Sequence, residues 1–410
     1  MRLGLEAAGK ALGIRTECVL SSEINPKSRE TYKMNFDETP AGDIHDLREF
    51  PDFEFLLGGF PCQPFSYAGK QKGFGDTRGT LFFEIERLLA DKQPRGFLLE
   101  NVRGLTTHDG GKTFETILTS LRNLGYGVTP LVINASSLGV PQNRVRVYIL
   151  GLLGTEPKLT LTSNLGAADS HSFKRKLMES SLFGDDSIHQ LVKHVLEDEV
   201  DPKYFCSPSF THALEEATGG NLNNLNGVRL IDYRGGNSLH SWDLGLKGKC
   251  SDEEKNLMNA IIRNRRLERF GSHQDGKRLS VLEISTFFES PSLQETIDSL
   301  VSKGYLKQVG GKYNPVSGNM SFEVFKFLDP DSVSITLVSS DAHKVGVVHK
   351  GRARRITPRE AARIQGFPDA YVVHPEDSVA YFQFGNAVAV PVVAKVMEDY
   401  LTNSSFLQAT

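Results

Sequence analysis

One cysteine stands in a turn whose neighbours suit nucleophilic chemistry. Cys62 lies in the segment GGFPCQPFS (residues 58–66), directly after a predicted buried strand over residues 53–59. Pro61 and Pro64 bracket it and stiffen the turn, because each ring fixes its own φ angle. A reactive cysteine needs an exposed, polar setting, since the thiolate is the nucleophile. The alternative is a buried structural cysteine, which is common for free thiols.

A carboxyl group and a polar strand are placed to face the same edge. Glu100 ends a predicted strand over residues 96–100. Gln142, Arg144 and Arg146 alternate where another predicted strand begins, and a period of two puts them on one face. Such side chains suit a ligand with phosphate or carbonyl oxygens. The alternatives are a solvated acid at a strand end and an exposed edge strand.

The elements that must position these residues alternate between strands and helices. Predicted strands cover residues 53–59, 96–100, 127–134 and 145–153, and predicted helices cover residues 80–91, 114–124, 358–365 and 390–401. This alternation predicts an α/β fold with a doubly wound sheet. In such sheets ligands bind beyond the carboxyl ends of the strands.

The middle of the chain differs from both ends. Between about residues 155 and 345 the periodicity weakens, and Asn and Gly turns accumulate. Residues 279–306 are typical of helix, turn, helix and the start of a strand, which is compatible with a winged-helix-like segment over 279–327. Any small helical insert is the alternative. We therefore predict one domain from 1–154 and 346–410, interrupted by a second over 155–345.

Composition excludes several classes of protein. The 410 residues are 39% hydrophobic and 24% charged, as in ordinary globular proteins rather than disordered ones. The longest apolar stretch, residues 145–153, is far shorter than the ~18–20 residues of a membrane span, and no signal peptide opens the chain. Four scattered cysteines without a CxxC pair exclude a disulfide scaffold and argue against zinc or another metal site.

Charge is informative only locally. The net charge of −3 does not indicate a nucleic-acid partner. Residues 344–359 nevertheless contain six lysines and arginines and no acid. A second basic run covers residues 263–278, for which a solvated surface is the alternative.

Further motifs follow the middle region, namely RITPREAARIQGFPD (residues 355–369) and QFGNAV (residues 383–388). Together with the Pro-Cys-Gln turn, the Glu-Asn-Val strand end and the Gln-x-Arg-x-Arg strand, they closely resemble the DNA cytosine-5 methyltransferase family of bacterial restriction-modification systems. The resemblance covers roughly residues 1–153 and 336–401. It implies a Rossmann-like, S-adenosylmethionine-dependent catalytic domain and a smaller mixed target-recognition domain.

The resemblance implies roles for the candidate residues. Cys62 would add to C6 of a cytosine, and Glu100 would hydrogen-bond N3 and the exocyclic amine. Arg146 would hold the O2 side, with Gln142 and Arg144 supporting the loop and nearby phosphates. The base would have to be flipped out of the duplex.

The implied cofactor is S-adenosylmethionine. Glu23 would bind the ribose hydroxyls, and Asp43 and Ile44 would meet the adenine. The full set expected to line the cofactor site is Glu23, Ile24, Asp43, Ile44, Leu81, Asn386 and Val388.

The start of the sequence departs from the family pattern. Family members open with a strand and a Phe-x-Gly-x-Gly-Gly turn before the helix that carries Arg-Leu-Gly-Leu. This sequence starts at Met1 inside that helix. We therefore expect a sheet lacking its first strand and weak cofactor binding, through a mis-set or truncated start.

The implied partner is double-stranded DNA, read by the middle region. The residues expected to contact DNA are Gln63, Ser66, Thr336, Arg352 and Arg354. We further expect a cytoplasmic, nucleoid-associated monomer that does not bind membranes, with a restriction endonuclease as its genetic partner. Two alternatives remain open: an RNA cytosine-5 methyltransferase, whose relatives have shorter middle regions, and a DNA-binding remnant that cannot hold the cofactor.

Overall fold

The computed structural model describes residues 1–61, 80–163, 190–233, 236–271, 277–316 and 322–407. The chain divides into two compact units. Unit 1 comprises Met1–Val195, Ser332–Ala342 and Pro358–Thr410, and unit 2 comprises Leu196–Asp331 and His343–Thr357. These bounds differ from the expected ones for a local reason. Residues around Ser334 pair with the loop at Gln142 in unit 1, whereas residues 345–355 form two strands of the sheet in unit 2.

Unit 1 is built on a four-stranded sheet with the strand order β1-β2-β4-β3. Its strands are β1 (Phe55–Gly59), β2 (Gly96–Val102), β3 (Tyr126–Asn134) and β4 (Val145–Leu153). β1 and β2 are parallel, and β4 runs antiparallel to both β2 and β3. All four strands were predicted from their apolar runs, and their existence is confirmed.

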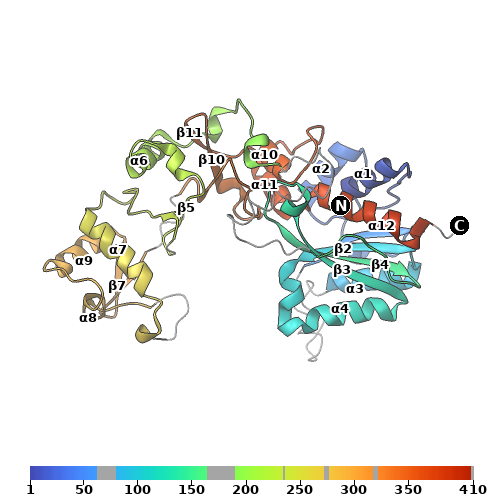
Figure 1. The fold of residues 1–410 in the computed structure, drawn as a ribbon, viewed down its shortest axis with the longest axis horizontal. Coiled ribbons are helices and arrows are strands. Elements are labelled where there is room, and N and C mark those ends of the chain that lie inside the picture. Colours follow the sequence, from blue (N-terminus) through green and yellow to red (C-terminus); the bar gives the residue numbers. More distant parts are fainter. Residues whose placement is uncertain (62–79, 164–189, 234–235, 272–276, 317–321, 408–410) are drawn as a thin grey trace. The chain divides into compact units, whose positions relative to one another are not determined.

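Helices cover both faces of this sheet. Figure 1 shows α3 (Thr80–Lys92) and α4 (Lys112–Asn123) on one face, and α1 (Arg2–Leu12) and α12 (Val390–Asn403) on the other. The pleat of β2 explains the two layers, because successive side chains point to opposite faces. Leu98 packs in the core under α12, whereas Phe97 and Leu99 pack against α3 and α4. The predicted doubly wound α/β fold is therefore confirmed.

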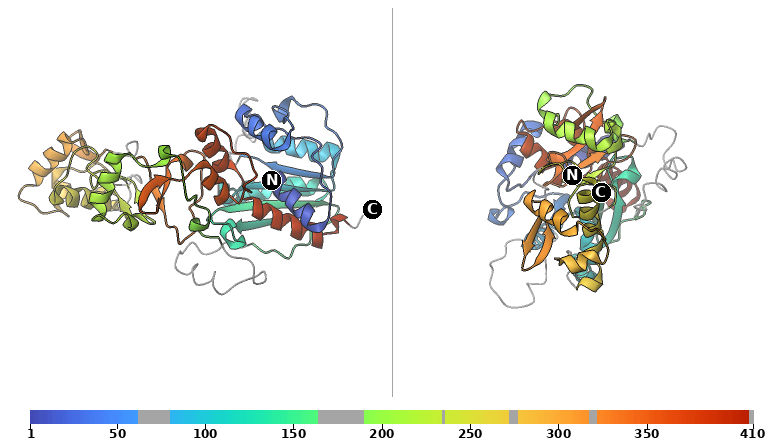
Figure 2. Two further views of the ribbon diagram at one scale, coloured as in Figure 1. Left: turned by 90° about the horizontal axis from the view of Figure 1, so that it is seen from above. Right: turned by 90° about the vertical axis from the view of Figure 1, so that its left-hand side faces the viewer.

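The described residues of unit 1 also form the helices α2 (Pro26–Phe36), α10 (Pro358–Ile364) and α11 (Asp377–Asn386). Figure 2 shows α1 and α12 side by side from a second direction. The stretch Asp377–Asn403 has 27 residues and contains an 18-residue window with a mean hydropathy of 1.3, which is long and apolar enough for a membrane span. It comprises two helices interrupted at residues 387–389, and the apolar face of α12 is buried in the core on the sheet. Its apolar composition thus matches its place in the core.

Unit 2 contains a five-stranded sheet in the order β11-β10-β9-β5-β6. The strands are β5 (Arg229–Leu230), β6 (Ser238–Leu239), β9 (Lys326–Leu328), β10 (Val345–His349) and β11 (Arg352–Arg355). Helix α6 (Pro208–Thr218) packs on it through Phe210 and Leu214, in a core shared with Phe327 and Val348. The short strands explain why periodicity alone did not predict this sheet.

A separate small core in unit 2 gathers α7 (Asp252–Asn264), α8 (Val281–Ser285), α9 (Leu293–Ser302) and the hairpin of β7 (Leu306–Val309) and β8 (Lys312–Pro315). Ser251 and Ser280 start α7 and α8 with capping boxes, in which Glu254 and Glu283 reach back to the cap. Leu279, just before α8, pairs with Tyr313 of β8. The chain order here is helix, strand, helix, helix, strand, strand.

Candidate active site

The carboxyl ends of β1 and β2 lie side by side and place Glu100 against the end of β1. Gly59 pairs with Glu100 in the parallel register. A Cβ built on Gly59 would lie 3.8 Å from Oε2 of Glu100, so the carboxylate lies beside the last residue of β1. The candidate nucleophile Cys62 follows shortly after Gly59. Cys62, Gln63 and Ser66 lie outside the described residues.

Glu100 is paired with Arg146 from the neighbouring strand β4. Nε of Arg146 lies 3.0 Å from Oε1 of Glu100, and the two side chains are 13% and 16% exposed. Burial raises the pKa of Glu100, and the positive charge of Arg146 opposes this rise only in part. A carboxyl group with a raised pKa can carry a proton nearer to neutral pH and donate a hydrogen bond. The structure thus brings together two of the residues that the sequence predicted for one site.

Asn101 is a residue of this site that the sequence reasoning missed. Its side chain is 3% exposed, and its Nδ2 donates a 2.7 Å hydrogen bond to the carbonyl oxygen of Phe60. Its Oδ1 accepts from the backbone N–H of Val102 at 2.8 Å. Asn101 therefore ties the end of β2 to the backbone just before Pro61 and Cys62. The available signal was an amide at the end of an otherwise apolar strand.

Gln142 and Arg144 are placed differently from the sequence expectation. Both precede β4 and are buried, at 0% and 3% exposure. Oε1 of Gln142 accepts from the N–H of Leu337, and the Arg144 guanidinium donates to the carbonyl oxygens of Leu337 and Ala387. Burial lowers the pKa of Arg144 to about 10. These contacts fit a role in supporting the loop, whereas the burial leaves no surface for the expected contact with phosphates.

Arg144 also fixes the turn that carries one of the expected cofactor residues. Its guanidinium donates to the carbonyl oxygens of Gly385 and Ala387, on either side of the exposed Asn386 at the end of α11. A Cβ on Gly385 would come within 2.3 Å of the backbone nitrogen of Ser339, so only glycine allows this close packing. Val388 is partly buried against the core on the α12 side of the sheet.

A short parallel bridge brings the two expected cofactor acids to one edge. Ser22 pairs with Ala41. Glu23 directly follows Ser22, and Asp43 stands two residues after Ala41. Oε1 of Glu23 accepts from the N–H of Asn25 at 2.8 Å. A hydrogen bond from the backbone N–H of His45 holds the pKa of Asp43 below its ordinary value, and the His45 ring adds to this effect.

Of the remaining expected cofactor residues, Ile24 and Ile44 directly follow these acids in sequence, whereas Leu81 lies on α3. Ile24, next to Glu23, is 68% exposed, so its side chain is accessible to a ligand. Ile44 opens a short 3₁₀ turn just after Asp43, which caps the turn. Leu81, on α3, packs against the core on the opposite face of the sheet. The hydroxyl of Thr336, expected to contact DNA, donates a 2.6 Å hydrogen bond to the carbonyl oxygen of Asn143.

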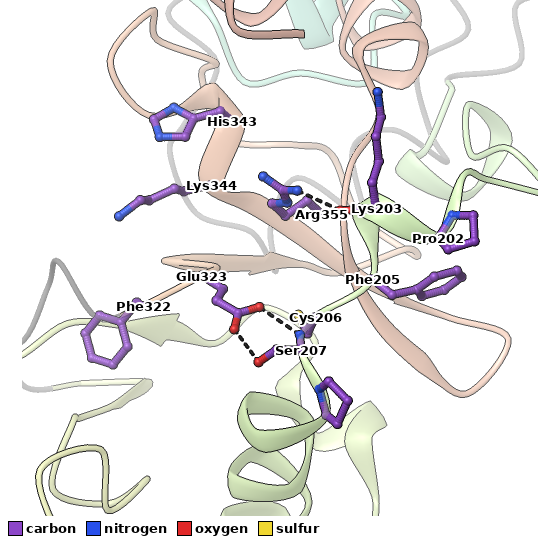
Figure 3. A pocket seen from close by; sticks show the side chains of 11 residues that line it. Pro202, Lys203, Phe205, Cys206, Ser207, Phe322, Glu323, His343, Lys344 and Arg355 are labelled. Carbon is purple, nitrogen blue, oxygen red and sulfur yellow. Dashed lines mark hydrogen bonds between the residues drawn. The ribbon is translucent and has the colours of Figure 1, made fainter.

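Unit 2 contains a basic cavity of about 610 Å³, shown in Figure 3. Its lining includes Lys203, His343, Lys344 and Arg355 against one carboxylate, Glu323. The Glu323 carboxylate already accepts two hydrogen bonds, one from the backbone N–H of Ser207 at 2.9 Å and one from the hydroxyl of the same residue. The Arg355 guanidinium donates to the carbonyl oxygen of Lys203 at 2.8 Å. The excess of cations suits an anionic group.

The two arginines expected to contact DNA differ in accessibility. Arg352 is exposed, and its guanidinium carbon lies 3.4 Å from the centroid of the Phe205 ring. Arg354 is 1% exposed, and its guanidinium donates to the backbone carbonyl oxygens of Arg355 and Glu197. The guanidinium of Arg354 is enclosed within unit 2, so its expected contact with DNA stays a prediction that requires this group to become accessible.

Comparison with known proteins places this arrangement in a family. The family model described as C-5 cytosine-specific DNA methylase matches residues 1–402. The chain is 59% identical over 404 residues to the Type II methyltransferase M.BanI of Aneurinibacillus aneurinilyticus, covering 98% of this chain and 94% of that protein. It is 62% identical over 399 residues to the Type II methyltransferase M.HgiCI of Herpetosiphon aurantiacus, covering 97% and 94%.

Solved structures agree on the fold. The chain is similar to the Dnmt2 methyltransferase of S. pombe, with a TM-score of 0.50 at 18% identity, over 97% of this chain and 95% of that one. A methyltransferase encoded within an E. coli prophage gives a TM-score of 0.51 at 19% identity, over 98% and 96%. The matched length and the high identity to Type II enzymes together show that this chain belongs to the C-5 cytosine-specific DNA methylase family.

Proposed function

We propose that the protein transfers a methyl group to C5 of a flipped-out cytosine within a specific duplex DNA sequence, with Cys62 as the nucleophile. The observation that carries this proposal is the buried pair of Glu100 and Arg146 beside the end of β1, from which the Pro61–Cys62 turn departs. Of the four cysteines, Cys62 is the one that follows the end of β1, three residues after Gly59 in the sequence. The pair supplies one hydrogen-bonding carboxyl group and one fixed cation at the sheet edge where family ligands bind.

Glu100 and Arg146 polarise the ring. The raised pKa of Glu100 favours a protonated carboxyl group, which can donate to N3 of cytosine while its other oxygen accepts from the exocyclic amine. Arg146 supplies a donor toward O2. Both groups withdraw electron density from the ring, so that C6 becomes open to attack.

Cys62 then acts as a covalent catalyst. Its thiolate forms an S–C6 bond, and the π electrons of the C5–C6 double bond move onto C5, in conjugation with C4 and N3, so that C5 becomes a nucleophilic enamine carbon. S-adenosylmethionine, when bound, supplies the methyl group that C5 accepts. Loss of the C5 proton to a base then restores the C5–C6 double bond and expels the Cys62 thiolate unchanged.

The residues at the Ser22–Ala41 bridge fit the cofactor. Glu23 and Asp43 each have carboxylate lone pairs left beyond their local contacts, which suits the ribose hydroxyls and the adenine amine. The exposed Ile24 offers an apolar surface to the adenine ring, with Ile44 nearby in sequence. Asn386, Val388 and Leu81 would bound the other sides of the cofactor.

DNA binding is assigned to unit 2 and to the loops around the site. The cavity of Lys203, Lys344 and Arg355 suits a phosphate, and Arg352 stands exposed on Phe205. Gln63, Ser66 and Thr336 would approach the flipped nucleotide. In the cell we infer a cytoplasmic, monomeric enzyme whose methylation protects DNA from an endonuclease of the same specificity.

The test is covalent trapping on a duplex that carries 5-fluorocytosine at the target position. Fluorine at C5 blocks the final elimination, so a stable protein–DNA adduct is expected in the presence of S-adenosylmethionine. Cys62→Ser should abolish the adduct, while Cys250→Ser should keep it. An adduct on a transfer RNA but on no duplex DNA would instead make the chain an RNA methyltransferase, and equal trapping by Cys62→Ser would remove Cys62 from the mechanism.

A further inference from the structure

The small core of unit 2 has the topology of a winged helix. Along the chain come α7, the single paired residue Leu279, α8, α9, and the β7–β8 hairpin, with Leu279 and β7 on either side of β8. In DNA-binding proteins of this kind, the second helix of the helix-turn-helix pair enters the major groove. The topology by itself therefore nominates α9 for that role.

The surface of α9 does not suit DNA. Its apolar side chains are buried in the small core, and the exposed positions Gln294, Glu295 and Asp298 bring two negative charges and no positive one. In addition, Nε2 of Gln294 donates a 2.8 Å hydrogen bond to Oδ1 of Asp298. Acidic side chains at this position would face the phosphates of a groove and repel them. The hairpin beside α9 turns through Gly310 and Gly311 alone, so it offers only a short wing.

Positive charge gathers instead at the end of α7 and on the described residues that follow it, 265–271 and 277–278. We name this region the arginine loop, after its four exposed arginines: Arg263 in the last turn of α7, and Arg266, Arg269 and Arg278 beyond it. None of the four is paired with an acid among the residues that the structure describes. The only acids in the run 263–278 are Glu268 and Asp275, of which Asp275 lies outside the described residues.

The arginine loop is held by contacts that leave these arginines at the surface. The backbone N–H of Lys277 donates to the carbonyl oxygen of Arg265 at 2.9 Å, which brings Lys277 and the following Arg278 next to the end of α7. The Lys277 ammonium donates to the carbonyl oxygens of Arg266 and Leu267, both at 3.0 Å. At the far side, the ring of Phe270 packs edge-on against Phe287 with centroids 6.0 Å apart.

Two of the arginines are themselves oriented before any ligand binds. The Arg269 guanidinium lies 4.6 Å from the centroid of Phe270, and the Arg266 guanidinium donates to the carbonyl oxygen of Tyr233 at 3.1 Å. An oriented guanidinium loses less side-chain entropy on binding a phosphate. It also keeps further donors for a bidentate contact.

We propose that the arginine loop, and not helix α9, docks unit 2 onto the sugar-phosphate backbone of duplex DNA. This inference rests on the proposed function in DNA methylation. The loop adds affinity that is independent of base sequence, while base reading belongs to other residues of unit 2. The winged helix is thus used through the four arginines of the arginine loop, with the acidic face of α9 away from the duplex.

The experiment compares duplex binding at several salt concentrations for three variants of the full chain. The first is Arg263→Gln with Arg266→Gln, Arg269→Gln and Arg278→Gln. The second is Glu295→Gln with Asp298→Asn on α9. The third removes the same amount of charge from exposed positions of unit 1, namely Lys10, Lys33, Arg15 and Arg122, each changed to Gln.

The arginine-loop variant should bind cognate and unrelated duplexes more weakly by the same factor. Its log–log salt slope should fall by up to ~0.9 for each phosphate that the loop no longer neutralises. The α9 variant and the charge-matched variant should keep the wild-type slope, and all variants should keep the wild-type circular dichroism spectrum. An unchanged slope in the arginine-loop variant overturns the proposal, as does a change of methylated sequence in the α9 variant. Wild-type protein that binds duplexes through the loop but never methylates them would contradict the proposed function alone.

Discussion

Nδ2 of Asn101 donates a 2.7 Å hydrogen bond to the carbonyl oxygen of Phe60, and this bond links the end of the strand that carries Glu100 to the backbone that leads into Cys62. Both partners are buried. The proposed nucleophile, Cys62, follows the end of β1 in the sequence, and Glu100 stands on β2, so their relative position depends on what joins the two strand ends. Beyond the ladder itself, Asn101 supplies that connection, and it acts as a positioning residue.

Asn101→Ala should lower kcat while leaving the affinity for duplex DNA near the wild-type value. The variant leaves the Phe60 carbonyl without its donor, which should also cost about 1–3 kcal/mol in the free energy of unfolding. Ile117→Val, in the core under α4, is the control because it should cost a comparable ~0.5–1.5 kcal/mol far from the site. Steady-state kinetics and urea unfolding of both variants provide the measurement. If both lose kcat equally, Asn101 contributes only to stability.

Glu100→Gln should abolish most activity while preserving duplex binding. An amide cannot carry the extra proton of a neutral carboxyl group, and loss of a positioned acid reduces rates by roughly 10²–10⁴-fold. Single-turnover methylation at saturating DNA measures the effect on chemistry. A variant that keeps its rate but binds duplex weakly would show that Glu100 serves DNA binding instead.

The same variant tests the raised pKa of Glu100 through stability. Because the folded protein holds this proton more tightly than the unfolded chain, wild-type stability should fall as pH rises from about 4.3 through the raised folded value. Glu100→Gln removes this dependence. The difference in unfolding free energy, wild type minus variant, should therefore be greatest at acidic pH and decline toward neutral pH. A difference that grows with pH would mean that Arg146 lowers the pKa more than burial raises it.

Arg144→Lys should weaken the binding of S-adenosylhomocysteine, through the turn at Asn386. A lysine cannot donate to the carbonyl oxygens of Leu337, Gly385 and Ala387 together, and each buried carbonyl left without a donor costs roughly 1–3 kcal/mol. Arg122→Lys on the exposed side of α4 is the matched control. Calorimetric titration of both variants decides the point. Wild-type affinity in Arg144→Lys would separate this arginine from the cofactor site.

The sequence predicted the four strands of unit 1 and its helices α3, α4, α10 and α12 because each of their patterns is local, whereas α2 and α11 were not predicted. The strand at Phe97, Leu98 and Leu99 and the amphipathic helix after residue 112 can be recognised within a dozen residues. The environment of Gln142 and Arg144 could not be recognised in this way. Their partners at Leu337, Gly385 and Ala387 are distant in sequence, so the alternation that suggested an exposed polar face says nothing about the segments that cover it.

Unit 2 shows the same limit for charge. The sequence shows only a basic run at residues 352–355. Which of its guanidinium groups are exposed to solvent depends on the orientation of each residue in β11. Arg352 lies on Phe205, whereas Arg354 is enclosed by the backbone at Glu197 and Arg355. Strands as short as β5 and β6 are too short to show an alternation of apolar and polar residues, so this sheet and its register could not be predicted from the sequence.

Neutralising the exposed Arg352 should weaken duplex binding, whereas neutralising the enclosed Arg354 should lower the stability of the protein. Arg352→Gln removes an exposed cation without leaving a buried group unpaired, so the free energy of unfolding should stay near the wild-type value. Duplex binding should weaken by the same factor for cognate and unrelated sequences, and the log–log salt slope should fall by up to ~0.9.

Arg354→Gln instead removes a buried guanidinium from two carbonyl oxygens, and should cost roughly 1–3 kcal/mol of stability. At temperatures where it stays folded, its salt slope should match that of the wild type. Salt titrations and urea unfolding of both variants distinguish the two roles. A stable Arg354→Gln protein with a reduced slope would show that Arg354 reaches the phosphates after all, and that unit 2 rearranges around β11 when DNA binds.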